Sequence, residues 1–160
     1  MMTYHKSLAA KLGKTLPTAA LALGLAFSAQ AATTTNPTLT QSKPIFLGGG
    51  EYPFSSAVRV GNTLYMSGQI GFKDGKLVEG GVKAEAKQAL DNINGTLLQY
   101  GYQKSDLVKC MVMLTDMDDF NDFNDVYKTE LAKPYPVRSA FGVADLAAGA
   151  SVEIECMAAK

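Results

Sequence analysis

Two arginines, Arg59 and Arg138, are the only guanidinium groups in the sequence, and their surroundings differ. Arg59 alternates with apolar residues in the stretch AVRV, which is typical of a side chain on a solvated strand face. Arg138 follows the segment PYPV and begins a run of small and apolar residues. An arginine that enters a buried strand requires an anionic partner. We therefore expect Arg138 to form either a structural ion pair or a bidentate clamp on a substrate carboxylate.

Two glutamates near the C-terminus, Glu153 and Glu155, alternate with apolar residues in the stretch VEIEC. In a strand, this alternation places both carboxylates on the same side, about 7 Å apart. One interpretation is a face exposed to solvent. The other is a subunit interface, where a glutamate with a raised pKa can act as a general acid or base.

The tripeptide Ser67-Gly68-Gln69 ends a hydrophobic strand. A glycine there allows a ligand to approach the backbone closely, although a simple β-bulge explains it equally well. Ser67 is a poor candidate for a nucleophile, because the only histidine, His5, lies in an N-terminal segment that we expect to be removed.

The N-terminal segment has the features of a secretory signal peptide. Three lysines precede an apolar run over residues 16–27, and the sequence SAQA at residues 28–31 matches a cleavage site. We predict a signal peptide at residues 1–31 that is cleaved after Ala31, a flexible lead at 32–44 and a folded domain at 45–160. The protein is then periplasmic or secreted, and we expect no membrane association after cleavage.

Removal of this segment limits the chemistry and the partners. The chain has 15 basic and 15 acidic residues, and residues 1–31 hold three lysines and no acid, so the remainder has a net charge of −3. Such a chain lacks the basic surface that nucleic acid requires. Without histidine it cannot form a Ser-His-Asp system or a His-ligated metal site. Any chemistry must then rest on carboxylates, arginine, lysine, tyrosine, hydroxyl groups, backbone amides and water.

The two cysteines, Cys110 and Cys156, fall in predicted strands among apolar neighbours. They are too few for a metal site made of thiolates alone. An oxidising compartment permits a disulfide, and two buried thiols fit the pattern at least as well.

Two helices and about six strands are predicted to position these residues. Apolar residues at helical spacing predict helices over residues 82–100 and 118–131. The predicted strands cover residues 57–60, 63–70, 77–78, 107–114, 137–143 and 151–158. The strand at 107–114 is apolar at nearly every position, which predicts burial on both faces. Two helices cover only one face of such a sheet, so we expect an α+β domain that oligomerises through the other face.

Several motifs, in the right order, resemble those of the RidA/YjgF family over residues 53–158. They are Ser67-Gly68-Gln69-Ile70, Asp119-Phe120 with Asn124 and Tyr127, Arg138-Ser139, and Gly149-Ala150 followed by Val152-Glu153-Ile154-Glu155. The resemblance implies a chorismate-mutase-like α+β fold and a homotrimer with sites in the clefts between subunits. It also implies hydrolysis of reactive 2-imino or 2-enamino acids to 2-oxo acids and ammonia, without metal or organic cofactor.

The resemblance also assigns site residues. The carboxylate-binding arginine of the family falls on Arg138, its acidic residue on Glu153, and its remaining contact positions on Ser67, Gly68, Asn124 and Phe54. Two positions depart from the family pattern: Phe54 replaces a tyrosine and lacks its hydroxyl, and Ala140 replaces a cysteine often found there. The cysteine's absence argues against thiol chemistry at the site.

In the implied mechanism, two side chains have separate roles. Arg138 clamps the substrate carboxylate, and Glu153 positions or deprotonates a water and returns the proton to the leaving ammonia. The alternative function is a non-catalytic trimer that binds small carboxylates or acts in a protective, chaperone-like role.

Overall fold

The computed structural model describes residues 42–160. The predicted signal peptide at residues 1–31 and the first part of the predicted lead, residues 32–41, lie outside the described residues. The first strand, β1, covers Ile45–Leu47. Over residues 42–160, none of the helices has the length and apolar character that a membrane span needs.

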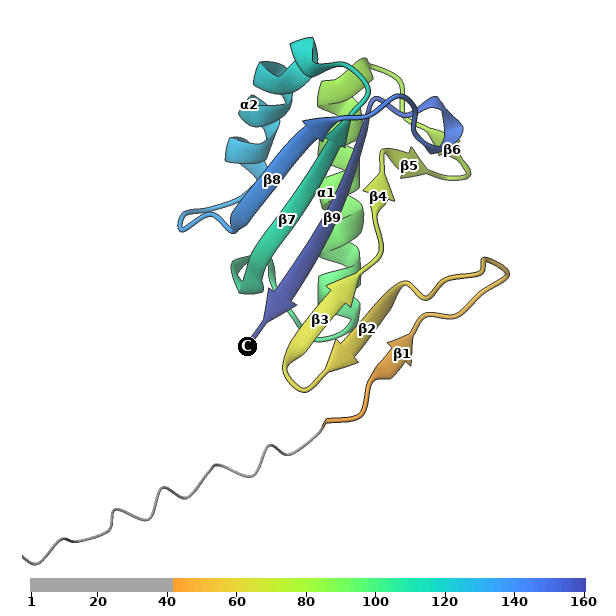
Figure 1. Ribbon diagram of the computed structural model, residues 1–160, viewed down its shortest axis with the longest axis vertical. Coiled ribbons are helices and arrows are strands. Elements are labelled where there is room, and N and C mark those ends of the chain that lie inside the picture. Colours follow the sequence, from red (N-terminus) through yellow and green to blue (C-terminus); the bar gives the residue numbers. More distant parts are fainter. Residues whose placement is uncertain (1–41) are drawn as a thin grey trace, which may run out of the picture. The chain divides into compact units, whose positions relative to one another are not determined.

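A mixed sheet of seven strands forms the centre of the domain (Figure 1). The strands run in the order β1-β2-β3-β9-β7-β8, and β4 pairs with β9. Only β7 and β8 pair in parallel among these strands, while the other pairs are antiparallel. Besides β1, the strands are β2 (Ala57–Val60), β3 (Thr63–Met66), β4 (Gln69–Ile70), β7 (Leu107–Leu114), β8 (Val137–Gly142) and β9 (Val152–Ala159). A separate hairpin joins β5 (Phe72–Lys73) to β6 (Lys76–Leu77).

Two helices, α1 (Gly81–Gln99) and α2 (Phe120–Glu130), cover one face of this sheet (Figure 1). The predicted apolar stripe of α1 is buried in the core with the inward side chains of β7 and β9. Helix α1 ends before Gly101, whose φ of 81° is the left-handed conformation expected of a glycine after a helix. The predicted α+β class, with both helices on one face of a mixed sheet, is confirmed.

A buried carboxylate ties α1 to the start of β9. Glu85, which is 4% exposed, accepts hydrogen bonds from the Ser151 backbone N–H at 2.6 Å and from the Ser151 hydroxyl at 3.0 Å. Two donors from one residue satisfy a carboxylate that burial would otherwise penalise. The contact fixes the position of the strand that carries Glu153 and Glu155.

The structure differs from the expected strands in three places. The predicted strand at residues 77–78 corresponds to β6, which pairs with the unpredicted β5 outside the main sheet. The predicted strand at residues 63–70 is divided into β3 and β4, because Ser67 leaves the ladder and donates its backbone N–H to the carbonyl of Ser56. Strand β1 was not predicted, since three residues after a polar segment give no period that the sequence alone reveals. It pairs with β2 and extends the sheet by one strand.

The prediction that strand 107–114 is buried on both faces was wrong for the single chain. Cys110, Val112 and Leu114 are buried beneath the helices, but Met111 and Met113 on the opposite face stay partly exposed. No element within residues 42–160 covers that face (Figure 1). We call it the open face. Its side chains include Phe46, Val58, Tyr65, Met111, Met113, Val137, Phe141, Glu153, Glu155 and Met157.

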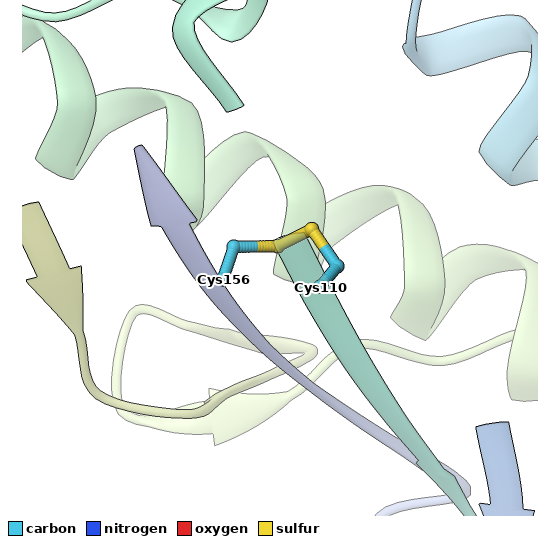
Figure 2. The surroundings of a disulfide bond; sticks show 2 residues. All are labelled: Cys110 and Cys156. Atoms are coloured by element: carbon cyan, nitrogen blue, oxygen red, sulfur yellow. A yellow bond between two sulfur atoms is a disulfide. The ribbon is translucent and has the colours of Figure 1, made fainter. Parts of the chain in front are cut away.

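A disulfide joins Cys110 in β7 to Cys156 in β9 (Figure 2). The two residues lie directly opposite each other in the ladder, and both side chains are buried beneath α1. The structure therefore decides between the two alternatives in favour of the disulfide. It links the two strands at the centre of the sheet.

Loss of this disulfide is expected to lower the free energy of unfolding by about 4 kcal/mol, because it closes a long loop in the unfolded chain. The two cysteines are 46 residues apart. Urea denaturation of the oxidised protein, the reduced protein and the Cys110→Ala/Cys156→Ala variant measures the loss. The reduced protein is the matched control, since it keeps both sulfur atoms in the core. Equal stability of the oxidised and reduced forms would contradict the prediction.

Candidate active site

Arg138 lies on β8, at an edge of the sheet. The prediction that it enters a buried strand was wrong, because Val137 beside it is 68% exposed and β8 pairs only with β7. Arg138 is opposite Cys110 in the register, so its side chain points to the face covered by the helices. There it is half-buried and forms no ion pair with a carboxylate of residues 42–160. Arg138 therefore has no ion-pair partner within residues 42–160, and this part of the chain does not support the interpretation as a structural ion pair.

Aromatic rings of α2 surround the Arg138 guanidinium instead. Its central carbon lies 4.9 Å from the ring centroid of Tyr127 and 5.5 Å from those of Phe120 and Phe123. The helical spacing of these three residues predicted a core stripe, and nothing in the sequence linked them to an arginine on a distant strand. Only the pairing of β8 beside β7 brings the cation under α2.

Tyr127 is 4% exposed, and its hydroxyl has no hydrogen-bond partner among the described residues. Burial raises the pKa of the Tyr127 phenol, while the positive charge of Arg138 acts to lower that pKa. The net shift is upward, so the phenol is neutral at physiological pH.

Glu153 lies on the open face, opposite Met113 of β7 and Ile70 of β4. Glu155 is on the same face, which confirms that the two carboxylates share a side. The Glu153 side chain lies against Gly68: a Cβ added to that glycine would be 1.9 Å from Glu153 Oε1. The glycine between β3 and β4 therefore makes room for the Glu153 carboxylate, a role that the bulge and ligand interpretations did not include.

Ser67 ties this break to the segment before β2. Its hydroxyl donates a hydrogen bond of 2.7 Å to the carbonyl of Ser55. Ser55 and Ser67 line a shallow cavity of about 250 Å³ together with Tyr65 and Glu155. The Ser67 hydroxyl therefore has a structural hydrogen-bond partner, and the cavity beside it is also lined by Glu155 of the open face.

The two remaining predicted contact residues occupy different elements. Phe54 is 59% exposed in the loop before β2, and its ring stacks on Tyr52 with centroids 5.4 Å apart. Asn124 is half-buried on α2, one helical turn after Phe120. Asn124 therefore belongs with Arg138 at the β8 edge, whereas Phe54 precedes the strands of the open face.

The predicted site residues thus form two groups that one chain does not bring together. The edge group is Arg138 with Asn124, and the open-face group is Glu153 with Ser67 and Gly68. On β7, Cys110 pairs with Arg138 and Met113 pairs with Glu153. The side chains of Cys110 and Met113 point to different faces of the sheet. They are also separated by roughly 10 Å along the strand. A site that uses both groups needs residues from two chains.

The other arginine lies outside both groups. Arg59 is opposite Leu64 in the β2–β3 ladder and is half-buried on the face covered by the helices, so the prediction of a solvated face was wrong. It lines a separate cavity of about 580 Å³ with Tyr100, Tyr102 and Lys160. Within residues 42–160, acidic and cysteine side chains form no group of three or more that could hold a metal ion.

Comparison with known proteins gives concordant results. Residues 49–160 match the family model described as Endoribonuclease L-PSP. The chain is 46% identical over 108 residues to the 2-iminobutanoate/2-iminopropanoate deaminase of Mus musculus, covering 66% of this chain and 80% of that protein. The corresponding protein of Bos taurus is 47% identical over 108 residues, which cover 66% of this chain and 79% of the relative.

Solved structures show the same fold. RidA from an Antarctic Psychrobacter species is 41% identical and superposes with a TM-score of 0.67 over 71% of this chain and 94% of that chain. The YjgF gene product of E. coli is 33% identical, with a TM-score of 0.66 over 69% of this chain and 91% of that one.

Replacing Gly68 by alanine is expected to displace the Glu153 carboxylate and leave the fold intact. The added Cβ meets only Glu153 side-chain atoms within 3.2 Å, and that side chain can rotate away. We expect a loss of about 1–2 kcal/mol in stability, typical of overpacking. The loss should vanish in a Glu153→Ala background, which a double-mutant cycle in urea measures.

Gly95 in α1 provides the matched control, because a Cβ added there meets nothing within 4 Å. Gly95→Ala should stabilise the protein by about 0.5–1 kcal/mol in both backgrounds, as expected for an exposed helical glycine. An equal cost of Gly68→Ala with and without the Glu153 side chain would show that the carboxylate does not occupy this space.

Proposed function

Because the chain belongs to the Endoribonuclease L-PSP family, we propose that it hydrolyses reactive 2-imino or 2-enamino acids to 2-oxo acids and ammonia. The two mammalian relatives described above carry the name of this activity. The observation that best supports the proposal is the Arg138 guanidinium, which is half-buried and lacks a carboxylate partner within residues 42–160. Such a group is suited to hold the carboxylate of a small imino acid through two hydrogen bonds.

The proposal includes a homotrimer whose sites combine residues from two protomers. Large apolar side chains on the open face support it: Phe46, Tyr65 and Phe141 are 71%, 45% and 42% exposed. An uncovered apolar sheet face of this kind is typical of a subunit interface. In such an assembly, the edge group of one protomer meets the open-face group of the next, so that Arg138 and Glu153 act on one substrate.

In the proposed reaction, Arg138 fixes the carboxylate and so holds the imine carbon near a water. Glu153 removes a proton from that water as its oxygen bonds to C2, the π electrons of the C=N bond move to nitrogen, and the nitrogen takes up a proton from solvent. In the resulting carbinolamine, Glu153 gives its proton to the amino nitrogen. The C–N bond then breaks with its electron pair leaving on ammonia, and the hydroxyl releases its proton to solvent as the C=O bond of the 2-oxo acid forms. An enamino acid first takes a proton at C3. Imines are intrinsically electrophilic, so orientation and proton transfer suffice.

The family description names an endoribonuclease, but the chain itself does not favour RNA as a substrate. The predicted mature chain has a net charge of −3 and contains no histidine, because the only histidine of the sequence, His5, lies in the predicted signal peptide. RNA phosphates are held mainly by lysine and arginine. The proposed partner is a small imino, enamino or 2-oxo acid, and no metal or organic cofactor is proposed. If the protein is exported as predicted, we propose that the reaction takes place in the periplasm or outside the cell, with an amino-acid oxidase or dehydrogenase as the source of the imine.

A trimer that binds 2-oxo acids without turnover is the second candidate. Phe54 favours it, because the phenylalanine cannot donate the hydrogen bond that the family's tyrosine provides. The stacked Tyr52 ring is the neighbouring source of a hydroxyl in the structure. Calorimetry with 2-oxobutanoate, combined with the assay below, separates the candidates: tight binding without acceleration supports the binding trimer.

The proposed activity predicts that the protein accelerates the decay of 2-iminopropanoate generated by an amino-acid oxidase. Arg138→Ala should reduce the acceleration by about 100-fold or more, because the carboxylate is then no longer oriented. Arg59→Ala is the matched control, since it removes the other arginine from a separate cavity and should leave the rate unchanged. Absence of acceleration by the wild-type protein would refute the proposed activity.

The shared site predicts complementation between two inactive variants. Arg138→Ala and Glu153→Ala subunits, mixed equally, unfolded and refolded together, should regain about one quarter of the wild-type activity, because each mixed trimer holds one intact site. Light scattering after size exclusion checks that the refolded protein is trimeric. A monomer at micromolar concentration, or mixtures that stay inactive as trimers, would contradict the shared site.

A further inference from the structure

The surroundings of Arg138 are unusual for a half-buried cation. The three rings of Phe120, Phe123 and Tyr127 belong to consecutive turns of α2 and all lie within 5.5 Å of the guanidinium carbon. At this separation, the negative face of an aromatic ring attracts a cation, and arginine is the cation that stacks best on such rings. Aliphatic side chains would fill the same space without this attraction.

Neutral rings and a carboxylate partner would have different effects on the arginine. A carboxylate would neutralise its charge and occupy two of its five N–H donors. Aromatic rings attract the guanidinium without neutralising its charge, and they do not accept hydrogen bonds from its donors as a carboxylate does. The contacts on α2 therefore restrict the side chain without competing for the ligand.

Of the three rings, that of Tyr127 lies closest to the guanidinium. Its centroid is 4.9 Å from the guanidinium carbon, and Tyr127 is buried, with 4% of its surface exposed. Its hydroxyl has no partner among the described residues, so hydrogen bonding does not explain a tyrosine there. The aromatic ring, and not the hydroxyl, therefore accounts for the contact of Tyr127 with Arg138.

We propose that the rings of Tyr127, Phe120 and Phe123 form a cage that holds the Arg138 guanidinium in the orientation required to bind a ligand carboxylate. Tyr127 is a positioning residue: it acts through Arg138 and does not touch the substrate. The effect on enzyme kinetics that this inference predicts rests on the proposed function. The arrangement of the cage can be tested without any activity.

The two arginines of the chain make a direct spectroscopic test possible. Protein labelled with ¹⁵N-arginine gives two side-chain Nε–H signals, and Arg138→Lys identifies one of them. Protons over aromatic faces are shielded, so the Arg138 signal should be shifted to high field. Tyr127→Leu should reduce this shift and Tyr127→Phe should keep it. Phe120→Leu, at a half-buried position, provides a second variant if Tyr127→Leu does not fold.

The kinetic test uses the same variants. Tyr127→Leu should raise KM for 2-iminopropanoate by about tenfold, the effect of losing one cation–π contact at a desolvated site. Tyr127→Phe should stay within about twofold of the wild type, because the lost hydroxyl had no partner. Tyr102→Leu is the matched control, since Tyr102 is also 4% exposed but lines the Arg59 cavity. It should leave KM and the Arg138 signal unchanged.

The outcomes separate this inference from the proposed function. An unshifted Arg138 signal in the wild type, or a signal and KM that Tyr127→Leu leaves unchanged, would overturn the cage. Equal effects of Tyr127→Phe and Tyr127→Leu would also overturn it and assign the role to the hydroxyl. If the wild type has no deaminase activity, the proposed function fails. The cage then requires that Tyr127→Leu weaken 2-oxobutanoate binding about tenfold in calorimetry, and it is overturned if binding is unchanged or absent.

Discussion

The proposed site depends on a guanidinium whose charge no carboxylate of residues 42–160 neutralises. Arg138 has this property because β8 is an edge strand, so only one side of it is paired and no acidic side chain of residues 42–160 reaches it. Partial burial makes such a charge costly unless an attractive neighbour is present. The rings of α2 supply that attraction, and in the proposed cage they keep the cation available for an anionic ligand.

The alternation of side chains across a sheet explains why one chain holds only half of the proposed site. Successive residues of a strand point to opposite faces, and the register places Arg138 beside Cys110 but Glu153 beside Met113. The cation therefore lies on the face with the helices and the carboxylate lies on the open face. The same face carries the exposed apolar side chains that a partner subunit would cover. Assembly and a complete site are thus linked in the proposal.

Strand β9 connects the stabilising contacts to the proposed chemistry. Its first residues are held by the hydrogen bonds from Ser151 to Glu85, and its centre is joined to β7 by the Cys110–Cys156 disulfide. Between these two points lies Glu153, with Gly68 leaving space for its carboxylate. In the proposed reaction, Glu153 transfers protons as a general base and acid. A rigid strand favours this role, because small changes in the position of the carboxylate alter the geometry of proton transfer.

The sequence by itself determined the two helices, most strands and the uncovered face, because periodic apolar residues report local structure directly. It also indicated Arg138 and Glu153 as the ionic residues of interest, through motifs that resemble one family. Tertiary structure alone decided three points: the edge position of Arg138, its contact with the α2 rings, and the pairing of Cys110 with Cys156. Each depends on which strands become neighbours and in what register, and such pairings join residues too far apart in the chain for local patterns to reveal.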